Sequence, residues 1–368
     1  MFGHQIVFRT DASLKMGTGH VMRCLTLADA LQAGGAQCHF ICREHPGNLI
    51  AHILKRGFTV SVLPAASETL STNEMDIETQ PNYEEWLGAD WEIDAKQTKS
   101  SVSAIEIDWL IVDHYAIDAR WEQVLRPLCP KLMVIDDLAN RQHVCDVLLD
   151  QNYSGDREQC YSSLVPNACK LLVGPRYALL HPEYVAYRNS QVSRNVGNQT
   201  VLVFFGGSDL QNMTGFTLNV LTQSELCSLN VDVVIGANNP HRMVLEKQVS
   251  GRSRTRIHGP RPHLADLMAQ ADLSVGAGGA TTWERMCLGL PSIVMSVAEN
   301  QRSVSEALAQ AGLIEYIGDV SEVNAIGLAG TIKQLIEDRN RMLAFASKTQ
   351  LLVDGLGTAR IADILATN

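Results

Sequence analysis

The sequence contains no Cys-x-x-Cys pair, although nine cysteines occur among its 368 residues. Such pairs are typical of zinc ribbons and dithiol redox sites, and an odd number of cysteines does not suit a disulfide scaffold. We therefore expect reduced and mostly buried thiols, no zinc ribbon, and a cytoplasmic protein.

Features that direct proteins to membranes or nucleic acids are also missing. No apolar run approaches the roughly 20 residues that cross a bilayer, and the first residues lack the basic and apolar regions of a signal peptide. The net charge of −10 argues against a broad basic face. We expect a small-molecule partner, with no nucleic acid and no membrane, and a monomer as the simplest assembly.

The first half lacks a dinucleotide fingerprint. A Gly-Thr-Gly turn at 17–19 follows an expected strand at 5–8 and opens an expected helix from about 20 to 34. Met22 stands where the fingerprint needs its third glycine. The turn still lies at a strand end and a helix start, where α/β proteins bind ligands, and His20 is placed at the edge of the crevice.

Strand and helix patterns alternate along both halves of the chain, which predicts parallel sheets. A polar stretch at 189–199 is the candidate linker. We predict an α/β fold with two Rossmann-like domains at 1–190 and 198–368, a cleft between them, and a C-terminal helix that can pack back on the first domain. Strands are expected at 5–8, 37–42, 59–63, 109–112, 131–135, 146–150, 170–174, 200–205, 231–235, 253–257, 273–275, 292–296 and 315–317.

Residues 64–100 interrupt this alternation with a polar, acidic insertion that carries Tyr83 and Trp86. One interpretation is a tolerated surface insertion. The other is a loop over the mouth of a substrate site, because aromatic residues are unusual in a solvated spacer.

Polar residues follow several strands of the first half. Asp113-His114-Tyr115 and Asp136-Asp137 each come directly after an apolar strand. Because the carboxyl ends of parallel strands share one edge of a sheet, these side chains are expected to line the same crevice as His20.

Two glycine turns in the second half, at 206–209 and 276–279, each follow a strand and precede a helix. Backbone N–H groups in such turns can hold a diphosphate, although plain helix packing is the alternative for each turn taken alone. Glu284, one turn into the following helix, can accept hydrogen bonds from ribose hydroxyls or simply favour the helix N-terminus.

As an ordered set from about Gln5 to Gly357, these motifs resemble the UDP-sugar hydrolases of pseudaminic acid biosynthesis, the PseG family, which is similar to the MurG glycosyltransferase. The motifs are Arg9-Thr10-Asp11 with the turn to His20, Asp113-His114-Tyr115, Val134 to Ala139, Gly206 to Asp209, Gly276 to Gly279, and Glu299-Asn300-Gln301. The resemblance implies a GT-B fold and release of UDP by water attack at the anomeric carbon with inversion. The product would serve flagellin, capsule or another glycan.

The same resemblance assigns His20 as the catalytic base and places Tyr115 at the reaction centre. An imidazole with a pKa of about 6.5 suits proton transfer near neutral pH. No Asp-x-Asp motif lies in a plausible place, so no metal and no cofactor is expected. The candidate substrate-binding residues are Arg9, Asp11, Gly17, Gly19, Gly206, Gly207, Ser208, Gly278, Gly279, Thr281, Glu284, Asn300 and Gln301.

Two rival interpretations remain open, the second of which covers two functions. A GT-B glycosyltransferase of the MurG type would share the fold, the nucleotide site and a base. A non-enzymatic nucleotide-sugar sensor or a dinucleotide-binding oxidoreductase is disfavoured by the missing fingerprint.

Overall fold

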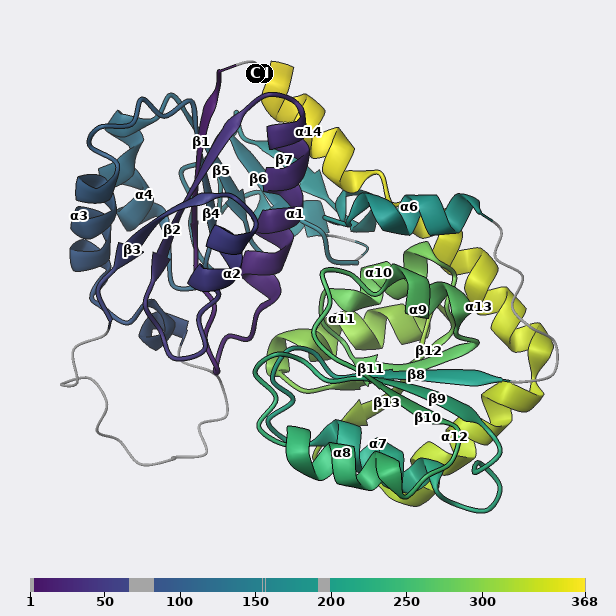
Figure 1. The fold of residues 1–368 in the computed structure, drawn as a ribbon. Coiled ribbons are helices and arrows are strands. Elements are labelled where there is room, and N and C mark those ends of the chain that lie inside the picture. Colours follow the sequence, from purple (N-terminus) through teal and green to yellow (C-terminus); the bar gives the residue numbers. More distant parts are fainter. Residues whose placement is uncertain (1–2, 66–82, 154, 156, 191–198, 368) are drawn as a thin grey trace. The chain divides into compact units, whose positions relative to one another are not determined.

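The computed structural model describes residues 3–65, 83–153, 155, 157–190 and 199–367. The chain forms two compact units, one from residues 1–179 with 357–368 and one from residues 180–356. Each unit is built around a sheet of its own (Figure 1). Residues 66–82 of the expected insertion and residues 191–198 of the expected linker lie outside the described residues.

The first unit contains a seven-stranded parallel sheet with the order β3-β2-β1-β4-β5-β6-β7. Successive residues of its strands face opposite helical layers: Ile6 and Phe8 belong to one apolar cluster and Val7 to the other. Burial on both faces explains why the central strands β4, β5 and β6 are nearly continuous apolar runs. The strands are β1 (Gln5–Thr10), β2 (Gln37–Arg43), β3 (Thr59–Leu63), β4 (Trp109–Asp113), β5 (Lys131–Ile135), β6 (Val147–Asp150) and β7 (Lys170–Val173).

Helices cover both faces of this sheet. Helix α1 (Gly19–Ala33) buries the apolar stripe that the sequence predicts, which includes Val21, Leu25 and Leu31. The opposite cluster includes buried residues of α3 (Trp91–Ser101) and α4 (Ala119–Leu125). Shorter helices are α2 (Ile50–Lys55), η2 (Tyr83–Leu87), η3 (Arg126–Leu128), α5 (Arg157–Tyr161) and η4 (Pro175–Tyr177).

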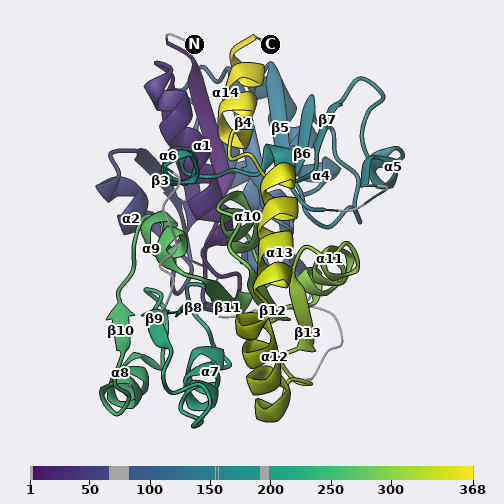
Figure 2. The ribbon, with the colours of Figure 1, turned by 90° about the vertical axis from the view of Figure 1, so that its right-hand side faces the viewer.

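The first unit is completed by α14 (Gly357–Thr367), which returns from the far end of the chain and lies beside α1 (Figure 2). Its Ile361 and Leu365 side chains are fully buried in the cluster that contains the α1 stripe. The Trp109 indole N–H also donates to the Leu365 carbonyl at 3.1 Å. The C-terminal helix α14 is therefore part of the core of the first unit.

The second unit contains a six-stranded parallel sheet with the order β10-β9-β8-β11-β12-β13. Its strands are β8 (Thr200–Phe204), β9 (Asn230–Val234), β10 (Thr255–His258), β11 (Leu273–Ala277), β12 (Ser292–Ser296) and β13 (Glu315–Asp319). Its helices are α6 (Pro182–Asn189), α7 (Met213–Leu221), α8 (Arg242–Ser250), α9 (Ala265–Gln270), α10 (Thr281–Cys287), α11 (Glu299–Gln310), α12 (Ala325–Glu337) and α13 (Arg339–Leu352).

Each sheet has one point at which the chain order reverses direction. In the first unit this point lies between β1 and β4, and in the second between β8 and β11. In doubly wound α/β sheets, ligands bind outside the carboxyl ends of the strands at this switch point. The topology therefore marks the carboxyl ends of β1 and β4 in the first unit, and of β8 and β11 in the second, as candidate ligand-binding positions.

Every expected strand is present in the structure, and three of them, at 59–63, 131–135 and 292–296, have the expected bounds. Within the insertion, where no regular structure was expected, the chain forms η2 and the longer helix α3. Its buried face consists of Asp94, Ala95 and Thr98, so it carries almost no apolar periodicity. All nine cysteines are free thiols, and six are buried, as expected.

Among the described residues, none of the helices combines the length and the apolar character needed to cross a membrane.

Candidate functional site

The switch point of the first unit brings the start of α1 next to the end of β4. Strands β1 and β4 are neighbours, with Thr10 paired to Asp113. Between β1 and α1 the chain makes a tight turn closed by a bridge between Ser13 and Gly17, whose φ of +76° is unfavourable for residues with a Cβ. This turn places His20, which is 7% exposed, on the first turn of the helix.

His20 is held by a carboxylate. Its Nδ1 lies 2.7 Å from Oδ1 of Asp113, which is fully buried. Arg23, one turn further along α1, donates to both oxygens of the same carboxylate at 2.6 and 2.7 Å. Burial by itself raises the pKa of Asp113, but Arg23 and His20 outweigh it and hold the pKa well below its usual value. Asp113 therefore stays ionised at any working pH.

An ionised carboxylate has no proton to donate, so the hydrogen between His20 and Asp113 belongs to Nδ1. The neutral ring then carries its lone pair on Nε2. His20 is thereby fixed in the orientation and tautomer that allow Nε2 to accept a proton, which is the relation between base and orienting acid in catalytic triads.

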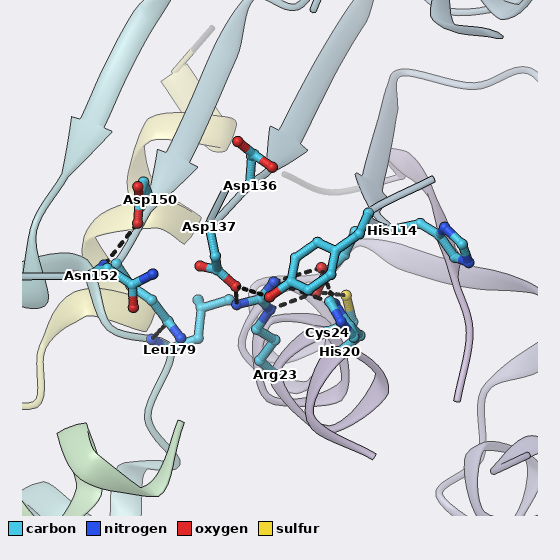
Figure 3. Close-up of polar contacts among 12 residues, drawn as sticks. His20, Arg23, Cys24, His114, Asp136, Asp137, Asp150, Asn152 and Leu179 are labelled. Carbon is cyan, nitrogen blue, oxygen red and sulfur yellow. Dashed lines mark hydrogen bonds and ion pairs between the residues drawn. The ribbon is translucent and has the colours of Figure 1, made fainter. Parts of the chain in front are cut away.

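Tyr115 lies against the same histidine. Its ring meets the His20 ring edge-on, with centroids 4.5 Å apart, and its hydroxyl donates to Oδ2 of Asp137 at 2.9 Å. Arg23 also donates to this oxygen, at 2.6 Å (Figure 3). Burial, and then the Asp137 carboxylate, raises the pKa of Tyr115 well above its usual value, so the phenol is neutral.

Arg9 and Asp11 belong to a separate buried ion network. Both are fully buried, and they pair with each other at 2.7 Å. Arg9 also pairs with Asp94 of α3 at 2.7 Å, and Arg43 donates to the same carboxylate oxygen at 2.6 Å. The Asp11 carboxylate further accepts from the Arg43 backbone N–H at 2.6 Å. This network joins β1, β2 and α3.

In the second unit, the Gly206–Asp209 turn follows β8 at the switch point. Asp209 accepts from the backbone N–H groups of Met213 and Thr214 at 2.8 and 3.0 Å and so caps the start of α7. Ser208 is buried, while Gly206 and Gly207 are half-buried. Burial raises the pKa of Asp209.

The end of β11 is packed so closely against β8 that it requires glycine. A Cβ on Gly276 would lie 2.3 Å from the Phe204 carbonyl oxygen. Gly278 and Gly279 both approach the side chain of Gln301, whose Oε1 accepts from the Val297 N–H at 3.1 Å. The structure therefore brings the β11 turn together with the start of α11, where half-buried Asn300 also lies.

Glu284 lies on α10, which this turn opens and whose first residue is half-buried Thr281. Burial raises the pKa of Glu284, while the hydroxyl of buried Tyr184 on α6 and the Arg285 guanidinium act to lower it. Arg285 points inward and donates to the Ala277 carbonyl at 2.8 Å, which fixes α10 against the end of β11.

The predicted residues thus form three groups. His20 and Tyr115 are in contact, and Gly17 and Gly19 lie in the turn at the start of α1. Arg9 and Asp11 are in the buried network. The remaining residues lie after β8, β11 and β12 in the second unit. Sequence reasoning placed Asp113 and Asp137 at the same crevice as His20 without assigning them a role there, and it missed Arg23. The sequence signal for this group is that both aspartates lie at strand ends and that Arg23 lies one helical turn after His20.

Over the described ranges, His, Cys, Asp and Glu side chains do not form a group of three or more that could hold a metal ion.

Comparison with known proteins gives distant relatives. The chain is 24% identical over 314 residues to the UDP-2,4-diacetamido-2,4,6-trideoxy-beta-L-altropyranose hydrolase of Campylobacter jejuni, covering 85% of this chain and 99% of that protein. The predicted resemblance is confirmed. The spore coat polysaccharide biosynthesis protein SpsG of Bacillus subtilis is 24% identical over 267 residues, which is 72% of this chain and 78% of SpsG.

An uncharacterized protein of Methanocaldococcus jannaschii is also 24% identical, over 304 residues and 81% of this chain. The match covers 57% of that relative, so this chain spans little more than half of its length. No protein-family model matches the chain.

Solved structures share the fold at low sequence identity. MurG of Acinetobacter baumannii superimposes with a TM-score of 0.67 at 13% identity over the whole of both chains. Arabidopsis thaliana UGT89C1, complexed with UDP, gives 0.66 at 11% identity over 98% of this chain and 99% of its own. The fold is therefore α/β of the GT-B type, as the sequence predicts.

Proposed function

We propose that the protein hydrolyses UDP-2,4-diacetamido-2,4,6-trideoxy-β-L-altropyranose to the free sugar and UDP, as a step of pseudaminic acid biosynthesis. The His20–Asp113 pair beside Tyr115 is the observation that carries this proposal. It provides an oriented base at the strand ends where sheets of this topology bind ligands. The hydrolase relative and the glycosyltransferase neighbours support the broader assignment, an enzyme acting on nucleotide sugars.

In the proposed reaction, Nε2 of His20 takes a proton from water as the water oxygen attacks the anomeric carbon from the face opposite UDP. The bond between that carbon and the phosphate oxygen breaks, and its electron pair leaves with UDP. His20 then releases the proton to solvent, so one proton is produced for each sugar. The Asp113 carboxylate stabilises the imidazolium while it exists.

We assign nucleotide binding to the second unit. The turns after β8 and β11 lie at a switch point, where backbone N–H groups of a glycine turn can hold the two phosphates. Glu284 is the candidate acceptor for the ribose hydroxyls, and Gly207 and Gly279 lie in the phosphate turns. Because UDP is a good leaving group, stabilisation of its charge by these amides is sufficient without a strong general acid.

The test is incubation of the purified protein with this UDP-sugar and no acceptor. Stoichiometric release of UDP and free sugar is expected, and in ¹⁸O-labelled water the label should enter the sugar only. Label in UDP would mean attack at phosphorus and would remove His20 and Tyr115 from the anomeric centre.

A glycosyltransferase reaction is the second candidate, because the fold neighbours named above include MurG and UGT89C1. That reaction uses the same base to deprotonate an acceptor hydroxyl. Absence of UDP release until an acceptor sugar is added would establish it in place of hydrolysis.

A further inference from the structure

Two aromatic residues of the insertion lie on the ring of Tyr115. Tyr83 and Trp86 belong to η2, and their rings meet at right angles with centroids 4.8 Å apart. Tyr83 meets Tyr115 edge-on at 5.1 Å, and Trp86 stacks on Tyr115 at 5.8 Å with an angle of 27°. Because Tyr115 also touches His20, the rings form a continuous aromatic path from the insertion to the base.

This aromatic group is not part of the closed core. Tyr115 is 6% exposed, whereas Tyr83 and Trp86 are each half-buried. The adjacent Leu87 is buried in the apolar cluster beneath and anchors the short helix. Tyr83 and Trp86 therefore keep accessible surface next to Tyr115, the ring that contacts His20.

The two sides of His20 thus differ in chemistry. Asp113, Arg23 and Asp137 form a charged side, and Tyr83 with Trp86 forms an apolar side reached through Tyr115. Ring faces bind C–H and methyl groups well, and a hydroxyl pressed against them loses its hydrogen bond to water without gaining another. An apolar surface at this position favours a ligand with methyl groups near its reacting carbon.

We infer that Tyr83 and Trp86 bind the sugar of the substrate and select N-acetylated, deoxygenated sugars over fully hydroxylated ones. This inference rests on the proposed function, in which the sugar carries two acetamido methyl groups and a 6-methyl group. One methyl-sized difference in an apolar site changes discrimination by about 10–200-fold, so the pair is sufficient to set a strong preference.

The test measures binding apart from turnover, in a His20→Asn background in which the sugar nucleotide stays intact. Calorimetry compares UDP, the UDP-diacetamido-trideoxy sugar and UDP-glucose. Trp86→Ala should weaken binding of the diacetamido compound by about tenfold and leave the Kd values of UDP and UDP-glucose unchanged, while Trp86→Phe should restore most of the loss. Tyr83→Ala should act in the same direction.

Trp91 offers a matched control. It is a half-buried tryptophan five residues along the same insertion, and its ring contacts Arg120. Trp91→Ala should leave all three affinities unchanged. Equal weakening of UDP and of the diacetamido compound by Trp86→Ala, or no weakening of either, would overturn the inference.

The two proposals fail separately in this design. If wild-type protein does not hydrolyse the sugar nucleotide but Trp86→Ala still weakens its binding selectively, the aromatic surface stands and the hydrolase proposal falls. If hydrolysis is efficient and Trp86→Ala binds the diacetamido compound as tightly as the parent, the hydrolase proposal stands and the aromatic surface has no role in selection.

Discussion

His20 and Asp113 are 93 residues apart in the sequence, yet Nδ1 of one lies 2.7 Å from Oδ1 of the other. The contact is made where the first turn of α1 passes the end of β4. Arg23 holds the same carboxylate with two hydrogen bonds, so the acceptor for His20 is itself fixed in place. The predictions on catalysis follow from this arrangement.

Replacement of His20 by Asn should remove turnover and leave nucleotide binding intact. The amide keeps polarity and similar size but accepts no proton, so kcat should fall by about 10²–10⁴-fold. Steady-state kinetics and calorimetry with UDP measure the two effects. His52→Asn, on α2 and outside the contacts described for this group, is the control and should retain full activity.

Asp113→Asn should inactivate the enzyme, because it changes the tautomer of His20. An asparagine that donates its amide hydrogen to Nδ1 moves the ring hydrogen to Nε2, which can then no longer accept a proton. We expect a loss in kcat of about 10²–10⁴-fold in protein that is folded by circular dichroism at the assay temperature. Activity near that of the parent in the folded variant would mean that His20 does not act through Nε2.

The same carboxylate gives a signed prediction for stability and pH. In the unfolded chain the pKa of the Asp113 carboxyl is about 3.9, and in the folded protein this pKa lies well below its usual value. Asp113 therefore stabilises the fold above the unfolded pKa, and this contribution is lost as pH falls toward the folded pKa. Urea unfolding should show Asp113→Asn less stable by about 3–5 kcal/mol between pH 7 and 5, with the difference shrinking below pH 4.

Glu284→Ala should weaken UDP binding if the carboxylate accepts ribose hydrogen bonds. Loss of such bonds costs about 1.5–3 kcal/mol, which corresponds to roughly 10–150-fold in Kd at 25 °C. Because burial raises the pKa of Glu284, affinity of the parent should also decline as pH falls toward that pKa. Glu306→Ala, an exposed glutamate on α11, serves as the control. Unchanged affinity in Glu284→Ala would remove this residue from the nucleotide site.

The central strands, such as β4 and β12, were predictable because burial on both faces makes each of them an apolar run with a turn signal after it. The first helix was predictable for a similar reason, since its stripe of Val21, Leu25 and Leu31 faces an apolar layer. Helix α3 was not, because it buries Asp94 and Thr98 instead of apolar side chains. Its partners are arginines on β1 and β2, which no local pattern connects to it.

The candidate site was predictable only in part. Strand ends and a helix start located His20, Tyr115 and the glycine turns. The pairing of Arg23 with Asp113 and Asp137 spans 90 and 114 residues, so it depends on which strands become neighbours. Sequence periodicity determines that a strand exists, whereas its neighbours follow from topology.

The return of α14 to the first unit has a consequence for synthesis on the ribosome. Residues 357–368 emerge only after the whole of residues 180–356 has been translated. Until then, the apolar surface that later accepts Ile361 and Leu365 stays bare, and the Trp109 indole lacks its carbonyl partner. The unit that begins first in the sequence therefore completes its core last, after the second unit has been made.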